Sequence, residues 1–164
     1  MTAYDTSEWT DFFVAGAGAS AALAGLVFVA VSINIDRILR LPGVPDRALA
    51  TVLLLLGIVL VSMIGLIPGQ SRTALGVELL VVGLGFAALI LGLTRRSMTG
   101  VGRPRGSASG HWVLAVLGTF PVVIGAASLL AEAGGGLYWI AAGIVLATAA
   151  AVANAWVLLV EILR

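Results

Sequence analysis

The chain has 164 residues, of which 60% are hydrophobic and 10% charged, and its mean hydropathy is +1.13. Soluble domains carry about 25% charged residues, so this composition excludes an ordinary soluble domain and indicates a chain that folds in lipid. The net charge is only +1, and the absence of cysteine excludes disulfides, thiolate metal sites and cysteine nucleophiles. We expect one integral membrane domain over residues 1–164.

Five apolar segments are long enough to cross the hydrocarbon core, which is roughly 30 Å thick and takes about 20 helical residues. The predicted spans lie near residues 13–35, 48–67, 75–93, 112–131 and 138–160. Residues 94–110, rich in Gly, Ser and Arg, are expected to form a mobile cytosolic loop. Continuous apolar runs lack the alternation of a membrane β-barrel, so the predicted fold is an all-α, polytopic bundle of five transmembrane helices.

The basic residues are all arginines, apart from one histidine, and their distribution predicts an orientation. With the N-terminus outside, the inner segments hold eight of them: Arg37, Arg40, Arg47, Arg95, Arg96, Arg103, Arg105 and Arg164. The outer segments hold only Arg72. Because inner loops are enriched in arginine, we expect the N-terminus outside and the C-terminus inside. Asp5, Glu8 and Asp11 are unlike the positive start of a signal peptide, so the first span should remain in the mature protein.

Small residues recur at helical spacing within several predicted spans. Lipid tails are as apolar as leucine, so helices associate in a bilayer through close backbone approach, which small side chains permit. On this basis the predicted packing residues are Gly18, Ala22, Gly25 and Ser32 in the first span, Gly57 and Gly65 in the second, Gly85 and Gly92 in the third, and Gly143, Ala147 and Asn154 in the fifth. For the first span two interpretations stay open: contact within the chain's own bundle, or contact between subunits.

Glu78, about one turn inside the third predicted span, is the candidate ion or proton site, because ionisable groups within spans are costly and often functional. The alternative is that its side chain reaches the outer interface and pairs with Arg72. The outer segments hold five acids, Asp5, Glu8, Asp11, Glu78 and Glu132, against Arg72 alone. Five negative charges and one positive charge leave −4 outside, which would concentrate cations at an entrance.

Two further polar features have structural and functional interpretations. Asn154 is expected at mid-membrane, where an interhelical hydrogen bond worth about 0.6–2 kcal/mol is the usual result and a pore role is the alternative. Four arginines of the long loop, Arg95, Arg96, Arg103 and Arg105, are predicted to contact anionic lipid or a cytosolic partner. Each arginine gains about 1 kcal/mol near an anionic membrane surface.

Catalytic chemistry finds no support in the sequence. The chain has one histidine, no cysteine and no paired acids next to a nucleophile. We therefore expect no enzymatic activity, no cofactor, no metal and no nucleic-acid partner. The predicted function is association through helices, as a self-assembling subunit or as an accessory subunit of a membrane complex, and the alternative is an oligomeric cation channel. The expected location is a bacterial plasma membrane, with anionic lipid at its inner leaflet.

Overall fold

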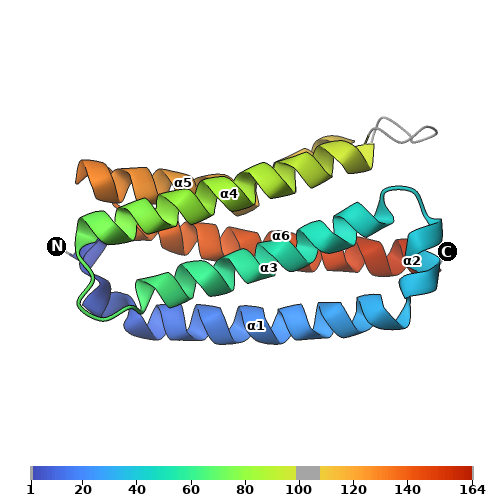
Figure 1. The fold of residues 1–164 in the computed structure, drawn as a ribbon, viewed down its shortest axis with the longest axis horizontal. Coiled ribbons are helices and arrows are strands. Elements are labelled where there is room, and N and C mark those ends of the chain that lie inside the picture. The colour runs from blue at the N-terminus through green and yellow to red at the C-terminus, as the bar shows by residue number, and fades with distance from the viewer. Residues whose placement is uncertain (1, 99–107, 164) are drawn as a thin grey trace.

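The computed structural model describes residues 2–98 and 108–163, and within them every regular element is helical. Five helices are long: α1 (Thr10–Ile33), α3 (Val44–Gly65), α4 (Arg72–Met98), α5 (Ala108–Ala131) and α6 (Leu137–Leu163). Three are short: η1 (Thr2–Tyr4), η2 (Thr6–Trp9) and α2 (Ile35–Arg40). Successive long helices run antiparallel (Figure 1).

All five long helices are long and apolar enough to cross a membrane, so the predicted number of spans is confirmed. Two of the predicted boundaries are wrong. The loop predicted at 94–110 begins too early and ends too late, because α4 continues to Met98 and α5 begins at Ala108. The remainder of that loop, 99–107, lies outside the described residues, as do Arg103 and Arg105.

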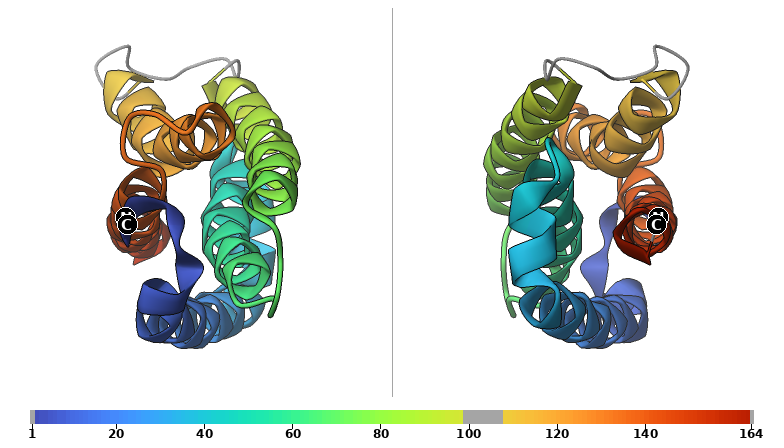
Figure 2. Two further views of the ribbon diagram at one scale, coloured as in Figure 1. Left: turned by 90° about the vertical axis from the view of Figure 1, so that its left-hand side faces the viewer. Right: turned by 90° about the vertical axis from the view of Figure 1, so that its right-hand side faces the viewer.

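The two ends of the bundle carry different segments of the chain, and we call them the N-terminal end and the α2 end. The N-terminal end carries residues 2–9 and the α3–α4 and α5–α6 connections, whereas the α2 end carries α2 and the C-terminus (Figure 1). Viewed along the bundle, α1, α3, α4, α5 and α6 follow one another around it (Figure 2). Each packs on the next, and α3 also packs on α6, but α1 meets α6 only marginally.

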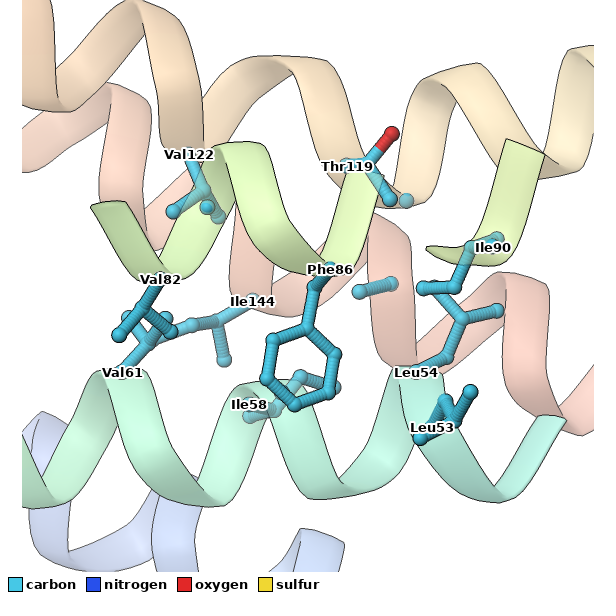
Figure 3. Close-up of a pocket in the computed structure, with 14 residues that line it drawn as sticks. Leu53, Leu54, Ile58, Val61, Val82, Phe86, Ile90, Thr119, Val122 and Ile144 are labelled. Carbon is cyan, nitrogen blue, oxygen red and sulfur yellow. The ribbon is translucent and has the colours of Figure 1, made fainter. Parts of the chain in front are cut away.

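The bundle interior is held together where glycines let neighbouring helices come close. A Cβ on Gly143 of α6 would lie 2.7 Å from Val122 Cγ2 and 3.1 Å from the Val122 backbone nitrogen of α5. A Cβ on Gly118 of α5 would lie 2.8 Å from Leu54 Cδ2 of α3. At the centre, α3, α4, α5 and α6 enclose a cavity of about 30 Å³ lined by apolar side chains such as Phe86 and Ile58 (Figure 3). An apolar cavity this small is expected to stay dry.

Helix α2 is a feature that the sequence analysis did not predict. The first helix stops at Asn34, whose φ of −106° and ψ of 14° leave the α-helical range. The Asn34 Nδ2 donates to the Ala30 carbonyl at 2.9 Å and so caps the end of α1. The chain then turns into α2, which crosses the end of the bundle between α1 and α3 (Figure 1). Ile38 anchors α2 because it is buried, while Arg37 and Arg40 remain exposed.

At the N-terminal end the first residues cross from α1 to the α5–α6 connection (Figure 2). The backbone N–H of Gly135 donates to the Tyr4 hydroxyl at 3.1 Å, and the Trp9 and Tyr138 rings meet edge to face at 4.9 Å. Gly136 has a φ of +38°, and a Cβ there would lie 2.5 Å from the Ala3 carbonyl oxygen. Glycine at this position thus allows both the turn and the close approach of the N-terminal segment.

Candidate functional site

Helix α1 differs from the other spans in how little of it the bundle covers. Only 6% of the most apolar 18 residues of its span are buried, against 33–50% in the other four spans. Its contact with α3 is made by one face, on which Phe13 and Ser20 are buried and Gly16 lies beside Ser62. The rest of α1 is left to lipid or to another protein.

The small residues predicted to pack lie on the opposite face of α1. At about 100° per residue, Gly18 and Ala22 stand about 140° and 180° around the helix from Phe13. Nothing lies within 4 Å of the Cβ positions of Gly18 and Gly25, and Ala22 and Ser32 are exposed. Contact of these four residues within their own bundle, one of the two open interpretations, is therefore wrong. We call Gly18, Ala22, Gly25 and Ser32 the smooth face of α1.

Some glycines of α4 also face away from the bundle, while others pack inside it. The Cβ positions of Gly85 and Gly92, two of the predicted packing residues, have no atom within 4 Å. The glycines that pack α4 inside the bundle are Gly76 and Gly83, where a Cβ would lie 2.8 Å from Leu130 Cδ2 and 3.3 Å from Val123 Cγ2 of α5. Neither Gly76 nor Gly83 is among the predicted packing residues, and the prediction for Gly85 and Gly92 is wrong for contacts within the bundle.

In α6 the predicted stripe does face the bundle. Gly143 and Ala147 are buried against α5, where a Cβ on Gly118 would lie 3.5 Å from the Ala147 Cα. Asn154 is half-buried towards the α2 end. It lines a cavity of about 10 Å³ together with Asp46, Arg47 and Thr94, so the polar groups of three helices meet there.

Arg47 is a residue whose place the sequence analysis missed. The predicted spans place Arg47 in the inner segment before the second span, whereas it lies in the first turn of α3 and is only 5% exposed. Its spacing carried a signal, because Arg47 precedes the buried Leu54 by seven residues and Ile58 by eleven, which places all three on one helix face. The Thr51 hydroxyl donates to the Arg47 carbonyl at 2.9 Å one turn later.

Glu78 lies in α4 near the N-terminal end and is partly buried. Its Oε2 accepts a hydrogen bond from the Gln70 Nε2 at 2.5 Å. The pairing with Arg72 that formed part of the alternative interpretation is not found, since Arg72 forms an ion pair with Glu132, with 3.1 Å between Nη1 and Oε1. The turn between α3 and α4 places Gln70 over the first turns of α4, and this decides which partner Glu78 finds.

Beside this turn lies a polar cleft of about 550 Å³, lined by residues that include Asp5, Arg72 and Glu132. The Arg72 guanidinium stands 5.6 Å from the centre of the Tyr4 ring. The Ser7 backbone N–H and hydroxyl both donate to the Asp5 carboxylate, and they hold the Asp5 pKa below its ordinary value. Asp5 therefore stays negatively charged to more acidic pH than a free aspartate would.

The described arginines gather at the α2 end. Arg95 and Arg96 occupy the last turns of α4 and are exposed, as are Arg37 and Arg40 of α2. The N-terminal end has Arg72 instead. The fold thus separates the arginines as the predicted orientation requires, although the compartment that each end faces stays a prediction.

These features define a class: a multi-pass, all-helical membrane protein whose first span is covered on one side only. Comparison of the chain with models of known protein families, with curated proteins and with solved structures finds no match in any of the three.

Proposed function

We propose that this protein acts by helix–helix association in the membrane, as a subunit that assembles with copies of itself, or as an accessory subunit of a larger membrane complex. The observation that carries the proposal is the smooth face of α1. It points away from α3, its Cβ positions at Gly18 and Gly25 are open, and no other described helix covers it.

The physical reason lies in the lipid. A small side chain facing lipid gains nothing over a large one, but it allows a neighbouring backbone to come close, which strengthens dispersion contacts between helices. Within the bundle, glycines such as Gly65 and Gly143 serve this purpose. A stripe of the same kind on the outer side of α1 would serve it for a helix of another molecule.

The mass of the intact protein tests this proposal, measured by native mass spectrometry from a mild detergent. We expect a defined oligomer of the wild-type chain, and a shift towards monomer in Gly25→Leu and Ala22→Leu. Ala127→Leu is the matched control, because Ala127 is exposed on α5, away from the smooth face. If wild type is monomeric, co-purification of a stoichiometric partner that Ala22→Leu releases would support the accessory role. A monomer without such a partner would overturn the proposal.

Cation conduction by the assembled subunits is the second candidate. The polar cleft at the N-terminal end, with Asp5 and Glu132 on its walls, favours it as an entrance for cations. Among the described residues, the centre of a single subunit is filled by apolar side chains such as Ile58 and Phe86 (Figure 3). A path would therefore run between subunits, so this candidate depends on association. We further propose that the protein is located in a bacterial plasma membrane.

A further inference from the structure

A wedge-shaped space separates α1 from α6. Near the N-terminal end the two helices come close, since a Cβ on Gly16 would lie 3.5 Å from Ile144 Cγ2. Towards the α2 end they diverge and leave a groove of about 510 Å³. Its walls are formed by Leu26 and Ala30 of α1 and by Val152 and Trp156 of α6. This volume falls in the range of about 300–1,000 Å³ that is typical of small-molecule sites.

The depth of the groove limits what can occupy it. The groove follows the nine residues from Leu26 to Asn34, whose eight steps of about 1.5 Å span about 12 Å. The length of the groove is less than half of the roughly 30 Å hydrocarbon core. A transmembrane helix of another subunit could therefore contact the groove along only part of its length. Beyond the other end of the groove, Gly16 of α1 and Ile144 of α6 lie close together. An acyl chain extends through one leaflet, about half of the hydrocarbon core, and this length is similar to that of the groove.

The chemistry of the groove points to the same occupant. Its lining is aliphatic and aromatic except for Asn34, whose amide Nδ2 is already engaged by the Ala30 carbonyl. At its open end lies α2, which contributes Ile38 to the lining and carries two exposed arginines one residue before and two residues after it. With Asp36, these arginines give α2 a net charge of +1. The groove is thus apolar, and its α2 wall belongs to a short basic helix with two exposed arginines, which is the charge that an anionic lipid headgroup requires nearby.

We propose that this groove is a binding site for one anionic phospholipid of the leaflet at the α2 end. One acyl chain lies between α1 and α6, and the phosphate headgroup lies at Arg37 and Arg40. The site uses the side of α1 next to α6 rather than its smooth face, so it does not depend on association of subunits.

The test uses the full-length protein in mild detergent with added phosphatidylglycerol or phosphatidylcholine of identical acyl chains. Native mass spectrometry counts the bound lipids, and a phosphatidylglycerol with a photoreactive acyl chain maps the contact. We expect one retained phosphatidylglycerol and labelling in the segments of Leu26–Asn34 and Val152–Leu158. Ala30→Trp fills the groove and should abolish retention, whereas Ala127→Trp, the same change on the lipid-facing side of α5, should leave it intact.

Arg37→Gln and Arg40→Gln test the headgroup. Each should reduce the preference for phosphatidylglycerol over phosphatidylcholine by about fivefold, the effect expected of one arginine near an anionic surface. Equal retention in Ala30→Trp and Ala127→Trp would overturn the proposal. So would a change of oligomer mass in Ala30→Trp without loss of lipid, because the groove would then hold a second copy of the chain. A preference unchanged in both arginine variants would overturn the choice of an anionic lipid.

Discussion

The ring of Phe13 in α1 occupies the position where any side chain on Gly65 of α3 would stand. Two of its ring carbons, Cε2 and Cζ, lie 2.8 Å from the place of a Cβ on Gly65. Phe13 is only 1% exposed, so its ring has little room to move. This contact fixes the N-terminal half of α1 against α3, the helix that α1 contacts most among the described elements.

We expect Gly65→Ala to lower the free energy of unfolding by about 1–3 kcal/mol, because a methyl group there forces the Phe13 ring from its site. Unfolding in a denaturing detergent, followed by circular dichroism, measures the change. Gly92→Ala is the control, since nothing lies within 4 Å of its Cβ position, and it should not destabilise the fold, because alanine favours a helix over glycine by up to about 1 kcal/mol. In a Phe13→Ala background most of the Gly65→Ala penalty should vanish. A penalty of equal size in both backgrounds would contradict the contact.

Tyr4→Phe should loosen the N-terminal segment. The variant removes the hydroxyl that accepts the Gly135 N–H, at an expected cost of about 0.5–1.5 kcal/mol. Faster amide hydrogen exchange at Gly135 and in residues 2–9 would report it. Because Tyr4→Phe keeps the aromatic ring under Arg72, Tyr4→Leu should have the larger effect. Unchanged exchange in both variants would show that other contacts hold the segment.

The separation of arginines predicts that the N-terminal end of the bundle faces outwards. Reporter enzymes that are active on only one side of the membrane, fused to either end of the chain, measure this directly. We expect the N-terminal fusion to report outside and the C-terminal fusion to report inside. Both termini on one side would contradict the count of five spans, and a reversed pair would contradict the orientation alone.

Glu78→Gln distinguishes the two proposed functions. If assembled subunits conduct cations past this carboxylate, flux into reconstituted vesicles should fall on loss of its charge. The amide still reaches the same place in α4, so the fold and the oligomer mass should not change. Absence of flux in the wild type under any voltage or pH gradient, or flux indifferent to the substitution, would remove Glu78 from this role. Absence of flux would also leave association as the remaining proposal, whereas flux indifferent to the substitution would keep conduction and place its path away from Glu78.

The sequence by itself determined the lipid environment, the helical class and the number of spans of this protein. The spans are predictable for a general reason. Backbone groups in lipid must be paired internally, so an apolar run of about 20 residues has almost no alternative to a helix. A run of three glycines is typical of a turn, and Gly134, Gly135 and Gly136 all adopt positive φ between α5 and α6. The break in the helix at Asn34 could not be predicted, because a single asparagine in an apolar run does not require a helix to end.

The tertiary structure alone decided which faces of α1 and α4 turn inwards. In water an apolar face must be buried, but in lipid every apolar face is already solvated. The periodicity of apolar residues therefore does not indicate which face of a helix packs against its neighbours. Helix α1 carries two stripes of similar spacing, one through Phe13, Gly16 and Ser20 and one through Gly18, Ala22 and Gly25. Only the fit of the Phe13 ring over Gly65, and of Gly16 beside Ser62, selects the first for α3 and leaves the second exposed.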